Sequence, residues 1–271
     1  MNKSQIIIVV LGVLLVVGMY SLPKVVVDND SAEEQAFIDE SNPGGVVDHS
    51  SAIPEDVLPK VDFWRKKLVL GDQIQQNLEA LDSLMQVFIQ INKYDSAAYY
   101  AERYAQTFNT ISHWQKAGDA YFEAYTFALD QAKITMLGEK ARSAYDRVLA
   151  KEPNNYDVKH NVAMTYVSST SPMQGIMMLR EIIDNDPSNE KALVSMGRMS
   201  IQTGQFENAV QRFETLISYY PEHIEGNFFL GVCYYETGQN VKAKAQFEKV
   251  KTLDTSEQMQ TAVNEYLERI S

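Results

Sequence analysis

The sequence predicts an all-α protein in which pairs of helices stack into a solenoid, preceded by one transmembrane helix. Two observations carry this prediction. Several residue types recur with a spacing of 34 residues, and residues 6–22 form an uninterrupted apolar run. A fixed period of this size is typical of repeat proteins, in which each unit buries its apolar side against the next. Hydrophobic residues at 45% and charged residues at 22% also exclude a chain that is disordered throughout.

The apolar run is the first predicted element. Residues 6–22 contain no charged side chain, and as a helix they would span roughly 25 Å, near the lower limit for a bilayer core. The alternative is a cleavable signal peptide, which has a shorter apolar core and a small-x-small cleavage site. The residues that leave the run, 18–23, offer no good site of this kind. We therefore expect an uncleaved anchor.

The charges that flank the anchor predict its orientation. Lys3 and the terminal amine precede the run, in a stub of residues 1–5, and Lys24 alone follows it closely. The positive-inside rule then favours a cytoplasmic stub by about one charge. We expect a single-pass protein of a bacterial inner (cytoplasmic) membrane with its body in the periplasm. A cytoplasmic body stays open as an alternative.

An acidic segment separates the anchor from the predicted repeats. Residues 23–60 are rich in acids, contain the breaker Asn42-Pro43-Gly44-Gly45 and have no sustained apolar period, so we expect a flexible linker. Residues 61–77 follow as a predicted N-terminal capping helix. This segment holds the densest aromatic and basic cluster of the chain, residues 63–67. A contact of that cluster with a membrane surface or a partner is the alternative to plain capping.

The 34-residue period is clearest in the second half of the chain. Four pairs of residues keep this spacing: Gly197 and Gly231, Gly204 and Gly238, Ala209 and Ala243, and Phe213 and Phe247. The glycines at 197 and 231 and the alanines are small where two helices cross closely, and the phenylalanines fill the gap to the next pair. Glycines 204 and 238 permit a tight turn between helices. Prolines 153, 187 and 221, also 34 apart, end the second helices.

These residues resemble the tetratricopeptide-repeat (TPR) pattern, and residues 78–257 are interpreted as about five such units. The last three units match it best. The unit 156–189 carries Ala163 and Gly175 at its two small positions and an irregular turn at 168–172. In the unit before it, an insertion from Phe122 to about Lys133 consists of helix-forming residues, and we interpret it as a lengthened first helix. Residues 258–271 are predicted to form a C-terminal capping helix.

The resemblance to TPR proteins implies a binding site. In that family the first helices line a concave groove that holds peptide or helical segments of partners. Carried onto this sequence, the groove positions are His160, Met164 and Val167, then Val194, Arg198, Ile201 and Gln202, then Phe228, Val232, Tyr235 and Glu236. The predicted groove is apolar, with Arg198 as a donor to a carboxylate or carbonyl. That several of these side chains only pack against neighbouring helices stays open.

The sequence lacks the motifs and charge patterns typical of nucleic-acid-binding proteins, metalloproteins and enzymes. The net charge of −12 argues against nucleic-acid binding, which needs a basic surface. The sequence has no metal-ligand motif, no nucleotide-binding loop and no arrangement typical of catalysis. We expect no enzyme, no catalytic residue, no metal, no cofactor and no small-molecule substrate. The single cysteine, Cys233, is expected to be a buried apolar residue rather than a reactive thiol.

The combination of anchor, acidic linker and TPR array resembles bacterial periplasm-facing TPR adaptors of the Sec translocon and chaperone network. The resemblance implies an envelope adaptor or assembly factor, a scaffold that binds partner or client segments in its groove. The alternative is a constitutive structural subunit of a large membrane complex that docks by its anchor or its convex face.

Overall fold

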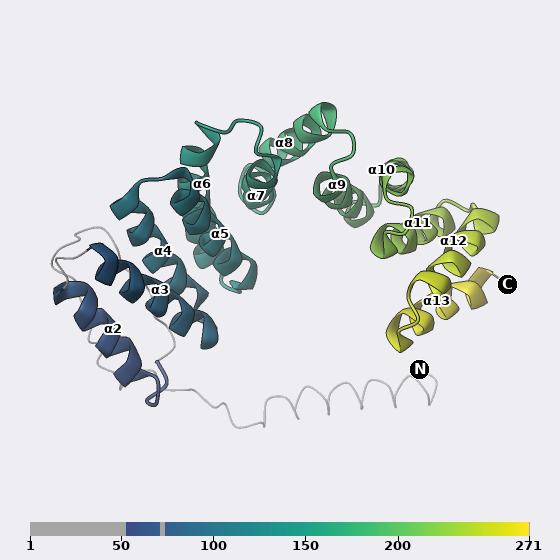
Figure 1. Cartoon of the computed structure of the whole chain (residues 1–271). Coiled ribbons are helices and arrows are strands. Elements are labelled where there is room, and N and C mark those ends of the chain that lie inside the picture. The colour runs from purple at the N-terminus through teal and green to yellow at the C-terminus, as the bar shows by residue number, and fades with distance from the viewer. Residues whose placement is uncertain (1–52, 71–73, 271) are drawn as a thin grey trace, which may run out of the picture. The chain divides into compact units, whose positions relative to one another are not determined.

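The computed structural model describes residues 53–70 and 74–270, and these residues form twelve helices and no strand (Figure 1). The helices are α2 (Leu58–Leu70), α3 (Ile74–Gln90), α4 (Tyr94–Phe108), α5 (Ile111–Phe127), α6 (Gln131–Leu149), α7 (Tyr156–Val167), α8 (Pro172–Asn185), α9 (Glu190–Gln202), α10 (Phe206–Tyr219), α11 (Ile224–Glu236), α12 (Asn240–Leu253) and α13 (Glu257–Ile270). No helix among these residues is long and apolar enough to cross a membrane. The predicted anchor, residues 6–22, and the linker as far as residue 52 lie outside the described residues.

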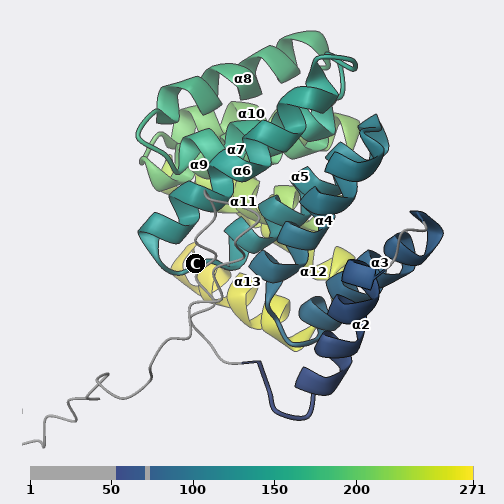
Figure 2. The same ribbon diagram turned by 90° about the vertical axis from the view of Figure 1, so that its left-hand side faces the viewer.

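The described helices pack mainly against their neighbours in the chain. Five helix pairs result, from α3 with α4 to α11 with α12, and α2 and α13 pack against the two ends of this series. Helices α7, α9 and α11 lie along one side of the row, and α8 and α10 lie along the other (Figures 1 and 2). The prediction of an all-α solenoid of about five helix pairs is therefore confirmed for the described residues.

The fourth and fifth pairs cross at glycine, as predicted. A Cβ atom added at Gly197 would lie 2.6 Å from Cζ of Phe213, and one added at Gly231 would lie 2.8 Å from Cε1 of Phe247. Both phenylalanine side chains are fully buried. The two crossings are thus equivalent, and each glycine is needed because a ring of the second helix occupies the space of its missing side chain.

The turns inside these pairs also follow the prediction. Gly204 and Gly238 adopt φ angles of +69° and +72°, in the left-handed region that glycine enters without steric cost. The amides that follow them close the turns, because Gln205 N donates to Ser200 O at 2.8 Å and Gln239 N donates to Tyr234 O at 2.7 Å.

The third pair, α7 with α8, achieves its close crossing differently. Ala163 and Leu179 stand where the next pair has Gly197 and Phe213. The small residue is on the second helix instead. A Cβ atom added at Gly175 would lie 2.3 Å from the carbonyl oxygen of Ala163. The irregular turn predicted here is present, since α7 ends at Val167 and α8 begins at Pro172.

The interpretation of the insertion as a lengthened first helix holds only in part. Helix α5 ends at Phe127, and α6 begins at Gln131. The Asp130 side chain accepts a hydrogen bond from Lys133 N at 2.9 Å and so caps the start of α6. The extra residues therefore lengthen both helices, to 17 and 19 residues, against 13 and 14 in α9 and α10. The cap ends a run of helix-forming residues that the sequence pattern alone would continue.

The two end helices cover the open faces of the row. The predicted single helix 61–77 differs from the structure, in which α2 already begins at Leu58 and ends at Leu70 and α3 begins at Ile74. Val61 is fully buried in a cluster with side chains of α3 and α4, and Arg65 Nε donates to Tyr100 OH at 3.0 Å. Phe63 stays half exposed. Helix α2 thus packs as an end helix, while the membrane or partner contact stays untested.

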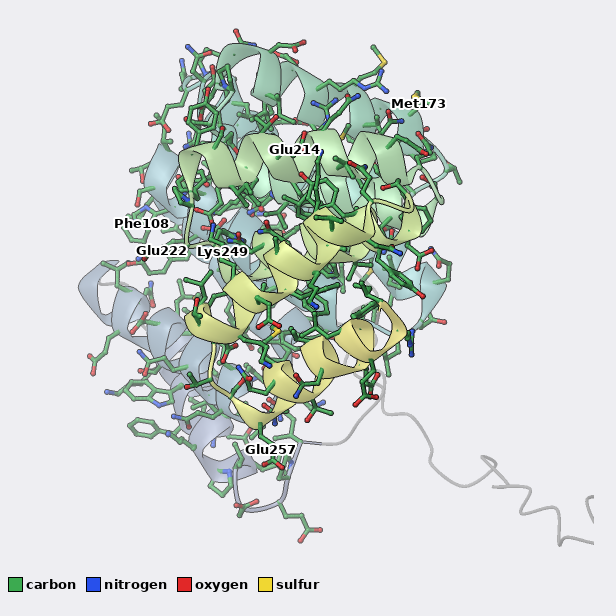
Figure 3. The ribbon with its side chains drawn as sticks, turned by 90° about the vertical axis from the view of Figure 1, so that its right-hand side faces the viewer. Phe108, Met173, Glu214, Glu222, Lys249 and Glu257 are labelled. Atoms are coloured by element: carbon green, nitrogen blue, oxygen red, sulfur yellow. The ribbon has the colours of Figure 1, made fainter. Side chains whose placement is uncertain are left out.

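At the other end, α13 lies beside α12 (Figure 3). Its bounds differ by one residue at each end from the predicted 258–271. Val263 is fully buried, and the Tyr266 ring stacks on Phe247 with 5.0 Å between centroids. The last helix therefore buries the apolar side that the fifth pair would otherwise expose.

Candidate functional site

The inner face is the candidate binding surface. We use this name for the surface that the first helices α5, α7, α9 and α11 present away from their second helices. The predicted groove residues come from three of these four helices. The residues that shape its polar part are Gln115, Lys116, Asp119, Asp157, His160, Asn161, Lys191, Ser195, Arg198 and Glu225.

A chain of hydrogen bonds runs along this face from α5 to α9. Tyr145 OH, from α6, donates to Asp119 Oδ1 at 2.7 Å and accepts from Asn161 Nδ2 at 3.0 Å. The Asn161 oxygen lies 3.4 Å from His160 Nδ1, and His160 Nε2 lies 2.9 Å from Ser195 Oγ. The imidazole thus contacts Asn161 through Nδ1 and Ser195 through Nε2, and its tautomer sets which nitrogen donates. The chain therefore joins the second, third and fourth helix pairs.

Two ion pairs connect neighbouring first helices. Lys191 Nζ lies 2.8 Å from Asp157 Oδ1, between α9 and α7, and Arg198 Nη1 lies 3.5 Å from Glu225 Oε1, between α9 and α11. All four side chains are largely exposed, so each pair contributes at most about 1 kcal/mol to stability. Where α5, α7 and α9 meet, the inner face is polar, which differs from the predicted apolar groove.

Burial sets the protonation of the hydrogen-bond chain. Desolvation lowers the pKa of His160, which keeps the imidazole neutral near pH 7. Desolvation raises the pKa of Asp119, although the hydrogen bond from Tyr145 opposes this shift. Burial and the adjacent Asp119 charge raise the pKa of Tyr145, so this phenol remains a donor. The hydrogen bond from Tyr145 holds the exposed Asp119 carboxylate at a fixed place on α5.

The predicted groove residues of α11 contact the chain itself. The Phe228 and Tyr235 rings lie 6.2 and 5.6 Å from Tyr266 of α13, measured between centroids. Val232 is only 9% exposed. The structure thus places Phe228 and Tyr235 beside Tyr266 of α13 and buries Val232, while Glu236 is exposed. The sequence identified α13 as a capping helix but gave no sign that its tyrosine reaches back onto α11.

The remaining predicted groove residues divide into two groups. Met164, Val194 and Ile201 are partly buried and pack against the apolar cluster of the C-terminal pairs. Val167 is also partly buried, beside Gly175 of α8. Arg198 and Gln202 are exposed, and His160 belongs to the hydrogen-bond chain. Of these remaining predicted residues, Arg198, Gln202 and His160 are therefore the polar groups on the inner face.

A cleft of about 470 Å³ lies on the inner side of α5. It is lined by Ile111, Ser112, Gln115, Lys116, Asp119 and Glu152. None of these residues was predicted as part of the groove. The sequence did hold a signal for Asp119. Asp119 follows Gly118 just as the predicted groove residue Arg198 follows Gly197. In the structure Gly118 packs closely against Tyr145, as Gly197 does against Phe213. The insertion after Tyr121 broke the period and hid this correspondence.

The described residues hold no cluster of three or more His, Cys, Asp or Glu side chains suited to a metal ion. Cys233 is buried, and burial raises the pKa of its thiol to about 12. The thiol is therefore protonated and inert near neutral pH. That the protein is not an enzyme stays a prediction.

Comparison with known proteins gives a family match in the C-terminal part. Residues 200–265 match the tetratricopeptide repeat family model. The human intraflagellar transport protein 88 homolog is 27% identical over 101 residues, which cover 35% of this chain and 12% of that protein. This chain therefore corresponds to a small part of that much longer relative.

Of two solved structures that resemble this chain, one has a TM-score above 0.5. A tetratricopeptide repeat protein from Parabacteroides merdae superposes with a TM-score of 0.51 at 17% identity, covering 73% of this chain and 76% of that one. The crystal structure of MamA protein has a TM-score of 0.49 at 14% identity and covers 66% and 93% of the two chains. Residues 200–265 thus match the tetratricopeptide repeat model, and the described residues have the fold of a tetratricopeptide-repeat solenoid.

Proposed function

We propose that this protein is a membrane-anchored adaptor or assembly factor that binds segments of other proteins along its inner face. The observation that carries the proposal is the cleft on α5, which continues into the polar surface of α7 and α9. A peptide backbone offers a donor and an acceptor at every residue, and a surface that holds it needs polar groups in fixed positions. Gln115, His160 and Ser195 are such groups.

The membrane part of the proposal rests on residues 6–22 and on the charges beside them. In this proposal the acidic segment that follows sets the repeats at a distance from the bilayer, on the periplasmic side. A reporter enzyme fused after Ser271, active on only one side of the membrane, tests the topology. Activity on the cytoplasmic side alone would contradict the periplasmic placement but would leave the binding surface unaffected.

Site-specific photocrosslinking tests the inner face. A photoreactive amino acid replaces Gln115, which lines the cleft, and in a matched variant it replaces Gln211, an exposed glutamine on the second helix α10. We expect covalent adducts with partner proteins in cells from position 115 and few or none from position 211. Adducts from position 211 alone would contradict the proposal.

The same cells distinguish an adaptor from a constitutive subunit. On a native gel, an adaptor runs partly free and partly in complexes, whereas a constitutive subunit runs only at one high mass. Detection of a free fraction would favour the adaptor.

A further inference from the structure

We propose that Asp119 is the anchor for a basic side chain, arginine in the first place, carried by the segment that binds in the α5 cleft. The inference rests on the proposed function and adds to it the chemistry of the partner. It follows from three features of the cleft, which are the fixed position of the carboxylate, the absence of an ion pair to it within 4.0 Å among the described residues, and the charge of its surroundings.

The carboxylate is held by a rigid neighbour. Tyr145 donates to Asp119 Oδ1 at 2.7 Å, and its ring is fully buried against Gly118, where an added Cβ atom would lie 2.5 Å from the ring. A second bond from Asn161 Nδ2 to Tyr145 OH, at 3.0 Å, fixes the hydroxyl. A carboxylate has about four acceptor positions, so one bond from a tyrosine leaves most of its capacity for an incoming donor.

Among the described residues Asp119 makes no ion pair. The carboxylate of Asp157, on the next first helix, is paired with Lys191 at 2.8 Å, and Glu225 is paired with Arg198. Asp119 is an exposed residue, and the cation that acts on its charge is Lys191, which is itself paired with Asp157. A carboxylate without an ion pair gains more from a new cation than one that is already paired.

The charge of the cleft favours the same ligand. Its lining holds two carboxylates, Asp119 and Glu152, and one ammonium, Lys116. One incoming cation makes this set neutral, whereas an incoming anion would face the excess negative charge. The chain as a whole carries −12, which attracts basic segments over a longer range. The flat guanidinium of arginine can bond a carboxylate oxygen and an amide such as that of Gln115 together, which a lysine ammonium does less well.

The proposal is tested by selecting peptides that bind and then removing the charge of the peptide, of Asp119, or of both. A library of short random peptides is displayed on phage and selected against the full chain in detergent micelles. Enriched peptides are then synthesised in two forms, with arginine and with citrulline, which has the same shape without the charge. Each form is titrated against the wild-type chain, Asp119→Asn and Glu207→Gln. Glu207 is an exposed carboxylate on α10, so the control variant makes the same charge change elsewhere.

We expect enriched peptides to share a basic residue whose change to citrulline weakens binding to the wild type and to Glu207→Gln about tenfold. The same change should leave binding to Asp119→Asn within about twofold. Asparagine keeps an acceptor for Tyr145, so the thermal unfolding of Asp119→Asn should stay close to that of the wild type. Selected peptides without a basic residue, or an equal citrulline effect in Asp119→Asn, would overturn the inference while leaving peptide binding intact. Failure to enrich any peptide would remove the proposed function and this inference with it.

Discussion

The third and fourth helix pairs solve the same packing problem in opposite ways. In the fourth pair the glycine is on the first helix, at Gly197, and the obstacle to a side chain there is the Phe213 ring. In the third pair the glycine is on the second helix, at Gly175, and the obstacle is the backbone oxygen of Ala163. A ring can rotate or be replaced, whereas a helical backbone cannot move without carrying its neighbours. The comparison teaches that both pairs keep the same close approach between their two helices, although the glycine that permits it lies on a different helix in each pair.

The largest effect is expected for Gly175→Ala. The new methyl carbon would lie 2.3 Å from the Ala163 oxygen, and also 2.9 Å from Val167 N, so α7 and α8 must separate. Overpacking of this kind costs up to about 3 kcal/mol, which exceeds the roughly 1 kcal/mol that alanine gains over glycine in a helix. Urea unfolding of the full chain in detergent measures the loss. A free energy of unfolding equal to that of the wild type would mean that the pair does not cross this closely.

A smaller and repairable effect is expected for Gly197→Ala. The methyl group would meet the edge of the Phe213 ring at 2.6 Å, and this ring has no free space because it is fully buried. We expect a loss of about 2 kcal/mol in the free energy of unfolding.

Adding Phe213→Leu should recover part of that loss, because alanine with leucine is the combination that the third pair carries at positions 163 and 179. A double variant as unstable as the sum of its two single variants would refute this account. No second substitution of a side chain should rescue Gly175→Ala in the same way, since its obstacle belongs to the backbone.

The regular part of the fold could be predicted because its cause is local. Gly231 and Phe247 repeat the spacing and the contact of the preceding pair, so the period alone indicated the crossing. The break between α5 and α6 could not be predicted from the sequence, because the residues around it favour helix. The cap at Asp130 decides where the second helix begins.

The candidate site was less predictable because it depends on distant contacts. Phe228 and Tyr235 stand at groove positions, and only the structure places Tyr266 over them. The hydrogen-bond chain joins Asp119 to Ser195 through three residues that no spacing rule connects. Polar contacts of this kind need angles and distances that a period does not specify.

A modest effect is expected for Gly204→Ala in the turn of the fourth pair. No atom lies within 4 Å of an added Cβ atom, so the cost comes only from the φ angle of +69°. An alanine in this region costs about 1 kcal/mol, and asparagine costs less because it tolerates the left-handed conformation. Thermal unfolding of Gly204→Ala and Gly204→Asn separates backbone strain from the packing effects above. An alanine variant as stable as the asparagine variant would show that the turn can relax to another conformation.

The smallest effect concerns the contact between the third and fourth pairs at His160. Burial lowers the pKa of this imidazole in the folded protein, so the unfolded chain binds its proton first as the pH falls. The stabilisation by neutral His160 is therefore complete above about pH 6.5, the ordinary pKa of histidine, and is lost below it. Asp157 and Lys191, the charged groups beside it, act in opposite directions on this pKa. Burial also lowers the pKa of His113, which contributes with the same sign.

His160→Gln removes one of these two titrations. Comparing urea unfolding at pH 7.5 and 5.5, we expect the wild type to lose more stability than the variant, by less than about 1 kcal/mol. This window lies above the pKa range of ordinary carboxylates, so the difference reports on histidine. An equal pH dependence in the two proteins would mean that His160 is solvated in the folded protein. It would then contradict the hydrogen bond between His160 and Ser195 as a link between α7 and α9.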